Sequence, residues 1–416
     1  MSLAVLSVGA LALAIVVSCV STLNVGVLAV ALAWVVGVYI GGIPVNTVMG
    51  GFPTQLFVTL DGVTLLFSMA HVNGTLDRLA HHAVRSCRGR RGLVPIMFFV
   101  MAAALASLGP GNISTAALLS PMAMSTAGRA GIPLFLMAIM VGNGANAGSL
   151  SPFAPTGIIV NGLMARNGMP GYEVSTYVYN LLAHALVAFG GYFLLGGLAL
   201  LASGRQERPD GSEPAAASSG AFERRHWLTM GVIGVLLAAV LFLGANVGMG
   251  AFFAAVVLVG LRAADDREAI KQMPWGVIVM VCGVTVLIAL LERAQGIDLL
   301  VSLVARIATS ETVTGVVAFL TGLISAYSST SGVVLPAFLP MVPGLARELG
   351  VADPFSIAAS MNVGGHLVDV SPLSTIGALC IASSPMGMDT RRLFNQLMAW
   401  GFSMCVVGAV LCYVLF

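Results

Sequence analysis

The sequence predicts an all-α polytopic membrane protein with about ten transmembrane helices and two re-entrant hairpins. Three observations support this fold class. Of the 416 residues, 58% are hydrophobic and 9% are charged, whereas a soluble globular chain carries roughly 25% charged residues. Apolar runs long enough to cross a bilayer recur along the whole chain. The two halves of the chain also repeat each other. This composition excludes a soluble enzyme, a disordered chain and a nucleic-acid binder, and a net charge of +2 is too small to indicate an anionic polymer as partner.

Ten apolar runs are interpreted as spans. The first lacks a basic stretch before it and is followed at once by a second run, so it is expected to be a retained span and not a signal peptide. In chain order, the runs are Leu3–Val20, Val25–Ile40, 55–71, 132–160, 176–202, 227–245, 249–262, 275–292, 352–383 and 393–416.

Two further apolar segments, 93–127 and 313–345, have polar centres rich in glycine and serine. If both are hairpins that enter and leave on one face, fifteen of the 19 Lys and Arg residues lie on one side of the membrane and four on the other. Single crossings would nearly abolish this bias. Basic loops favour the cytoplasmic side, so we expect an inner, cytoplasmic membrane location with both termini outside.

The chain divides nearly in half at a polar segment. Residues 203–225 are rich in Pro, Gly and Ser and predict a flexible cytoplasmic linker between a first repeat, 1–202, and a second, 226–416. Each repeat holds five spans and one hairpin. A basic stretch, Leu76 to Arg91, is expected to form an interfacial helix.

Five short matches relate the halves at offsets of 219 to 222 residues. Because five spans is an odd number, the second repeat is expected to run inverted relative to the first. Inverted repeats with interrupted helices at corresponding positions are typical of secondary transporters. The matches pair Asn24-Val25-Gly26 with Asn246-Val247-Gly248, Val63-Thr64 with Val284-Thr285, Leu108–Pro121 with Tyr327–Pro340, Asn143–Gly148 with Asn362–Gly365, and Ser151-Pro152 with Ser371-Pro372.

Four polar segments interrupt the apolar pattern: the hairpin tips Ser107–Thr115 and Ser325–Gly332, and the span centres Asn143–Thr156 and Asn362–Thr375. Irregular backbone cannot face lipid, so these segments must be buried or line a wet cavity. Free N–H groups at helix starts attract anions, and carbonyl, Asn and Ser oxygens suit a hard cation such as Na⁺. The pattern predicts an anion site with cations beside it.

The candidate site residues lie within these segments. Asn side chains there are either ligands or polar contacts between helices, and Ser114, Thr115, Thr330 and Ser331 either cap the hairpin arms or touch ligand. Each Ser-Pro pair is expected to restart a broken helix, with Ser as N-cap and Pro following. We predict substrate contacts from Gly111, Asn112, Ser114, Ser151, Pro152, Thr330, Ser331, Ser371, Pro372 and Thr375. We predict cation contacts from Asn112, Thr115, Asn143, Asn146, Ser331, Asn362, Gly365 and Asp369.

Asp369 and His366 are ionisable residues inside the second break and have no charged counterparts in the first. An ionisable group at membrane depth indicates a functional role, so Asp369 is expected to neutralise a cation or carry a proton, and His366 to titrate. The other interpretation is a polar bond that fixes the unwound backbone. No nucleotide-binding or hydrolase motif occurs in the sequence. We therefore expect no enzyme activity and no cofactor other than a coupling ion.

The motifs resemble those of the divalent-anion/sodium symporters of the ion-transporter superfamily. The segment Gly111–Pro121 resembles the family's hairpin tip, with Asn112 and Thr115 at the positions of its Asn and its later Thr. The tip Thr330–Pro340 is a looser match, Asn362–Gly365 is similar to the family's Asn-Ile-Gly-Gly, and the Ser-Pro pairs resemble its Thr-Pro. Gly111 and Ile113 stand where the family has hydroxyls, and Ser331 where it has Asn. The N-terminal half most resembles malonate/dicarboxylate carriers of the MatC type.

The resemblance implies a dicarboxylate bound between the hairpin tips, Na⁺ near each tip, and an elevator motion, often in a homodimer. The expected activity is import of small dicarboxylates such as malonate, succinate or malate, coupled to a cation gradient. Two alternatives stay open: a proton-coupled or antiporting anion transporter of the same fold, and a membrane subunit that transports only with a binding protein. The expected partners are the substrate and membrane lipid, with no nucleic acid.

Overall fold

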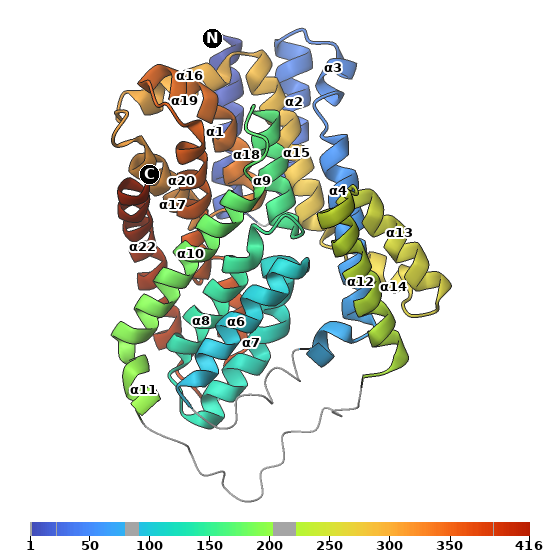
Figure 1. Ribbon diagram of the computed structural model, residues 1–416. Coiled ribbons are helices and arrows are strands. Elements are labelled where there is room, and N and C mark those ends of the chain that lie inside the picture. Colours follow the sequence, from blue (N-terminus) through green and yellow to red (C-terminus); the bar gives the residue numbers. More distant parts are fainter. Residues whose placement is uncertain (1, 22, 80–90, 203–221, 386) are drawn as a thin grey trace, which may run out of the picture.

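A computed structural model describes residues 2–21, 23–79, 91–202, 222–385 and 387–416, and in these residues it contains helices and turns but no strand. Among these described residues, seven helices are long and apolar enough to cross a membrane, and six shorter apolar helices accompany them. The protein is therefore a multi-pass helical membrane protein (Figure 1). The count of ten spans and the re-entrant course of the hairpins stay predictions.

The described helices follow one another along the two halves of the chain. In the first half these are α1 (Leu3–Val20), α2 (Val25–Trp34) with η1 (Val35–Ile40), α3 (Val45–Met49), α4 (Thr54–Val72), α6 (Leu93–Leu108), α7 (Gly111–Ala130), α8 (Leu134–Ser149), α9 (Pro155–Arg166), α10 (Glu173–Tyr192), η2 (Phe193–Gly197) and α11 (Leu198–Ala202). In the second half they are α12 (Arg224–Leu243), α13 (Val247–Gly260), α14 (Asp266–Gln272), α15 (Trp275–Arg293), α16 (Gly296–Ala305), α17 (Val313–Ser325), η3 (Thr330–Val334), α18 (Leu335–Phe338), η4 (Leu339–Met341), α19 (Val342–Leu349), α20 (Pro354–Leu367), η5 (Val368–Val370), α21 (Thr375–Ala382) and α22 (Thr390–Leu415).

Several elements match between the halves in detail. The Asn24 side chain caps α2 by accepting from the backbone N–H of Gly26, and the Asn246 side chain caps α13 by accepting from that of Met249. Helices α4 and α15 both have 19 residues and both follow a proline. Two of the five sequence matches, those at Asn24 and at Val63, therefore fall at similar positions of the helices that hold them.

Glycines allow helices of the two halves to cross closely. A Cβ on Gly283 of α15 would lie 2.2 Å from the backbone oxygen of Gly26 on α2. At the equivalent crossing, a Cβ on Gly62 of α4 would lie 2.3 Å from the backbone oxygen of Gly248 on α13. Only glycine permits backbones to approach this closely. Each half thus contributes one helix to each of two tight crossings.

Two helical hairpins carry their tips into the middle of the molecule. The first consists of α6 and α7, which lie in the lower part of Figure 1 and are joined at Gly109-Pro110. Gly109 has φ +140°, a conformation that L side chains rarely adopt. The second hairpin runs through α17, turns at residues 326–329 and continues into η3 and α18.

Two helices are broken beside these tips. Residues 150–154 separate α8 from α9, and residues 371–374 separate η5 from α21. The predicted restarts at the Ser-Pro pairs are wrong: α9 begins at Pro155 after the N-cap Ala154, and α21 begins at Thr375 after the N-cap Ser374. Ser151 instead donates its hydroxyl to the backbone oxygen of Ser107 at 2.7 Å. The serine is thus engaged by the first hairpin and does not cap the next helix.

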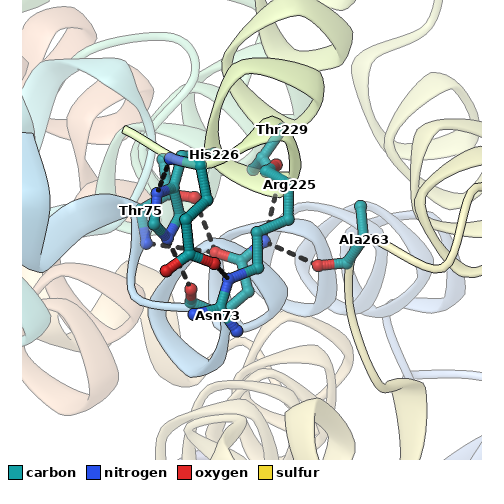
Figure 2. A network of polar contacts seen from close by, with 7 residues as sticks. Asn73, Thr75, Arg225, His226, Thr229 and Ala263 are labelled. Carbon is teal, nitrogen blue, oxygen red and sulfur yellow. Dashed lines mark hydrogen bonds and ion pairs between the residues drawn. The ribbon is translucent and has the colours of Figure 1, made fainter. Parts of the chain in front are cut away.

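A buried polar network docks the start of α12 against the end of α4 (Figure 2). The Nδ2 atom of Asn73 donates to Thr229 Oγ1 at 2.7 Å and to the backbone oxygen of Ala263 at 3.1 Å. Its Oδ1 accepts from the backbone N–H and the hydroxyl of Thr75. The His226 Nδ1 accepts from the backbone N–H of Glu223, so its Nε2–H donates to the backbone oxygen of Asn73. Every polar end of the Asn73 amide is paired.

Two predicted features fall partly outside the described residues. Most of the linker predicted at 203–225 lies in residues 203–221, and most of the interfacial helix predicted at Leu76 to Arg91 lies in residues 80–90.

Candidate functional site

A cavity of about 390 Å³ lies where both hairpin tips meet the second helix break. Its opposite wall comes from the α1–α2 turn and from the start of α15. It is lined by Ser18, Leu23, Asn24, Val25, Asn112, Ile113, Gly276, Met280, Tyr327, Ser328, Ser329, Thr330, Ser331, Asp369, Leu373, Ser374, Thr375 and Ile376.

Helix starts surround this cavity. Asn112 and Ile113 belong to the first turn of α7, Thr375 and Ile376 to that of α21, and Val25 to that of α2. The first turns of helices carry N–H groups without intrahelical partners and a partial positive charge. The cavity wall therefore favours a negatively charged ligand, although none of the described residues that line it is Lys or Arg.

Among the described residues, Asp369 is the one carboxylate that lines the cavity. Its Oδ1 accepts the hydroxyl of Thr330 at 2.7 Å, which joins the second tip to the second break. The hydroxyl of Ser374 donates to the backbone oxygen of Asp369 and so closes the break locally. A lone carboxylate repels an anionic ligand unless a cation or a proton neutralises it.

The first hairpin tip is bound to the first break through amides. The Asn112 Nδ2 donates to Asn146 Oδ1 at 2.8 Å, and Asn180 of α10 donates to the backbone oxygen of Asn146 at 2.8 Å. Three buried polar atoms in this cluster have no partner: Thr115 Oγ1, Asn146 Nδ2 and Asn180 Oδ1. All four side chains are at most 9% exposed.

A second buried layer lies along α8, α10 and α20. The His184 Nδ1 and the Asn143 Oδ1 are 2.9 Å apart, and because the Asn143 Nδ2 donates to the backbone oxygen of Ile139, His184 is the donor. His366 donates from Nδ1 to the backbone oxygen of Asn362. These bonds fix the local backbone and side chains behind the cavity.

The structure divides the predicted residues into two groups. Those that line the cavity are Asn112, Thr330, Ser331, Asp369 and Thr375. Those that lie outside its lining are Gly111, Ser114, Thr115, Asn143, Asn146, Ser151, Pro152, Asn362, Gly365, Ser371 and Pro372. Within the second group, Thr115, Asn143, Asn146 and Asn362 are buried next to the breaks.

Sequence reasoning missed one whole wall of the cavity. Ser18, Asn24, Gly276 and Met280 come from ordinary apolar spans, and only the tertiary fold brings them to the tips. The Ser18 and Ser328 hydroxyls lie 2.9 Å apart, and Asn24 donates to the backbone oxygen of Gly276 at 2.8 Å. One signal was available, since the Asn24 triplet recurs at Asn246.

The donor atoms fit a hard monovalent cation. Amide, hydroxyl and carbonyl oxygens are the ligands that such ions prefer, and Thr115 and Asn180 each keep a buried oxygen unpaired. No cluster of three or more His, Cys, Asp or Glu side chains suited to a metal occurs among the described residues. The first tip therefore offers oxygen donors of the kind that Na⁺ prefers.

In the part of the chain that the structure describes, the fold is all-helical, and its broken helices and hairpin tips around a central cavity are features typical of membrane transporters. Residues 1–149 match the family model described as the N-terminus of the dicarboxylate carrier protein MatC. The resemblance to MatC-type carriers is thereby confirmed over these residues.

Two solved structures share the fold. The YdaH transporter of Alcanivorax borkumensis is 16% identical, with a TM-score of 0.61, and the match covers 88% of this chain and 87% of that one. MtrF of Neisseria gonorrhoeae, from a class of antimetabolite efflux pumps, is 14% identical with a TM-score of 0.61 and coverage of 92% and 84%. No curated protein sequence matches the chain.

Proposed function

We propose that this protein is a secondary transporter that imports small dicarboxylates of the malonate, succinate and malate class, driven by a cation gradient, with Na⁺ as the coupling ion. The proposal includes two inverted repeats, an elevator motion of the hairpin-bearing part against α1, α2 and α15, and a homodimer in the inner membrane.

The observation that carries the proposal is the charge pattern of the cavity. Helix starts supply partial positive charge from several directions, while the one formal charge in the lining, Asp369, is negative. A dianion binds well in such a wall only together with a cation. A volume of about 390 Å³ lies at the lower end of the range for small-molecule sites. The match of residues 1–149 to a dicarboxylate carrier model supports the substrate class.

In this proposal, the residues have the following roles. The first turns of α7 and α21 bind and orient the two carboxylates through N–H groups, and Thr330, Ser331 and Thr375 donate hydroxyl hydrogen bonds. Asn112, Thr115 and Asn146 at the first tip and Asp369 at the second hold the coupling cation. Bound Na⁺ supplies the positive charge that offsets the dianion and Asp369.

The experiment is uptake of labelled malonate and succinate by the purified protein in liposomes, with an inward Na⁺ gradient or with K⁺ instead. We expect Na⁺-dependent uptake by the protein alone. Asn112→Ala should lower uptake by about tenfold or more, because it removes the bond to Asn146 at the cavity edge. Asn167→Ala is the matched control, since that side chain bonds to Leu163 on α9 away from the cavity.

Each result is decisive for one part of the proposal. Uptake that ignores both Na⁺ and pH gradients would refute the coupling, and full activity of Asn112→Ala would refute the site. The proton-coupled or antiporting alternative is favoured by the lone carboxylate in the cavity. Under that alternative, uptake follows the pH gradient, and Asp369→Asn removes this dependence.

A further inference from the structure

Asn180 on α10 lies against the end of α8, beside the first helix break, with one end of its amide unpaired. Its side chain is fully buried. Its Nδ2 donates to the backbone oxygen of Asn146 at 2.8 Å and faces that of Ala147 at 3.5 Å. Because a carbonyl oxygen can only accept, these contacts fix which end of the amide is nitrogen. The Oδ1 atom is left buried without a partner.

Two neighbouring side chains, Thr115 and Asn146, also have a buried polar atom without a hydrogen-bond partner. Thr115, one turn after Asn112 on α7, is 1% exposed, and its Oγ1 has no hydrogen-bond partner. The Asn146 Oδ1 accepts a hydrogen bond from Asn112, and the Asn146 Nδ2 has no partner. This nitrogen is a donor, so among the unpaired atoms only the oxygens of Thr115 and Asn180 count toward a cation site. Buried polar atoms are almost always satisfied in folded proteins, so a cluster of unpaired ones indicates a missing ligand.

The same chain shows that a buried Asn can be fully satisfied. Asn73 is 5% exposed, and both ends of its amide are paired (Figure 2). Asn180 is more deeply buried than Asn73, and unlike Asn73 it has an amide oxygen without a hydrogen-bond partner. Packing constraints common to the fold therefore do not explain the unpaired Oδ1.

We propose that Asn180 supplies an oxygen ligand from α10 to a monovalent-cation site at the first hairpin tip, together with Thr115 Oγ1 and oxygens of Asn112 and Asn146. The cluster contains oxygen donors but no carboxylate, which suits a singly charged ion better than a divalent one. No motif assigns Asn180 to a site. The inference rests on the proposed Na⁺ coupling for the identity of the ion.

The position of Asn180 on α10 supports this role. Thr176, Asn180 and His184 stand at successive four-residue steps, so they share one face of the helix, and all three are buried. His184 and Asn180 bond to Asn143 and Asn146 respectively on α8. Helix α10 thus packs polar side chains against α8 beside the first break. Asn180 is connected to the tip residue Asn112 through Asn146, which bonds to both.

The test is Na⁺ binding by the full-length protein in detergent, without substrate, measured as the rise in melting temperature with added NaCl at constant ionic strength, with KCl as balance. A ligand that binds only the folded state raises its stability in a concentration-dependent way. We expect Asn180→Ala to require a Na⁺ concentration at least about tenfold higher than the wild type for the same rise in melting temperature. Asn180→Asp keeps an oxygen at this position and should retain the Na⁺ response.

Thr176→Val is the matched control, because it removes a buried polar group from the same face of α10 where the hydroxyl contacts Met164 Sδ at 3.7 Å. It should keep the wild-type Na⁺ response. If Asn180→Ala lowers the melting temperature equally in Na⁺ and in K⁺ and leaves the Na⁺ affinity unchanged, the side chain is only structural. That result would overturn the inference. If Asn180→Ala does not fold, loss of the Na⁺ response in Asn180→Asp overturns it equally.

A wild-type protein without any Na⁺ response would overturn both this inference and the Na⁺ coupling. Uptake of malonate in liposomes under a pH gradient then shows separately whether the protein is a dicarboxylate carrier.

Discussion

Among single residues, Asp369 is the one that we expect to affect binding in the cavity most directly. It is the one carboxylate in the lining, and its bond to Thr330 connects the second tip to the broken helix that follows. Asn112 plays the corresponding part at the first tip through Asn146, without a charge. The two tips therefore differ in charge although the sequence repeats around them.

Replacing Asp369 with Asn should weaken coupling and leave the fold intact. The amide oxygen of Asn still accepts from Thr330, while the negative charge that attracts a cation is lost. We expect about tenfold more Na⁺ for half-maximal uptake, equivalent to about 1.4 kcal/mol. Uptake as a function of Na⁺ concentration measures this. Asp298→Asn on α16, outside the cavity lining, is the control, and an unchanged Na⁺ requirement in Asp369→Asn would contradict the role given to Asp369.

At the scale of elements, the tight glycine crossings bear most on stability. The crossings α2–α15 and α4–α13 leave no room for a side chain at Gly283 or Gly248. Gly283→Ala would set a methyl group 2.2 Å from the Gly26 oxygen, so the helices must separate. We expect a loss of about 1–3 kcal/mol in the free energy of unfolding, seen as a lower melting temperature in detergent.

The control for this substitution is Gly234→Ala on α12, where a Cβ would meet nothing within 4 Å. That variant should be neutral or slightly more stable, since alanine favours a helix over glycine by about 0.5–1 kcal/mol. Equal melting temperatures for the two variants would show that the crossing tolerates a methyl group.

The helix breaks were predictable from sequence because polar, glycine-rich stretches stand out inside apolar runs, as in Asn143–Thr156 and Asn362–Thr375. The points where the helices restart were not predictable. Ser151 resembles an N-cap locally, but its hydroxyl is taken by the backbone of Ser107 from the neighbouring hairpin. Ser18, Asn24 and Gly276 escaped prediction for the same reason, since only long-range packing gives them a place beside the tips.

For the whole molecule, the distribution of positive charge gives a prediction about orientation. With both hairpins re-entrant, fifteen of the 19 basic residues lie on the side that the positive-inside rule assigns to the cytoplasm. Both termini then face outward. Alkaline phosphatase fused after Phe416 should be active in intact bacteria, and green fluorescent protein at the same place should be dark. The opposite pair of signals would contradict an outward-facing C-terminus.

The interleaving of the two halves also has a consequence for how the protein can be divided. Because α2 packs closely on α15 and α4 on α13, neither half holds a complete set of helix partners within itself. The halves are related to each other as the subunits of a domain-swapped dimer are. Cutting the chain in the linker should therefore yield two fragments that are poorly stable alone and assemble into one working protein when made together.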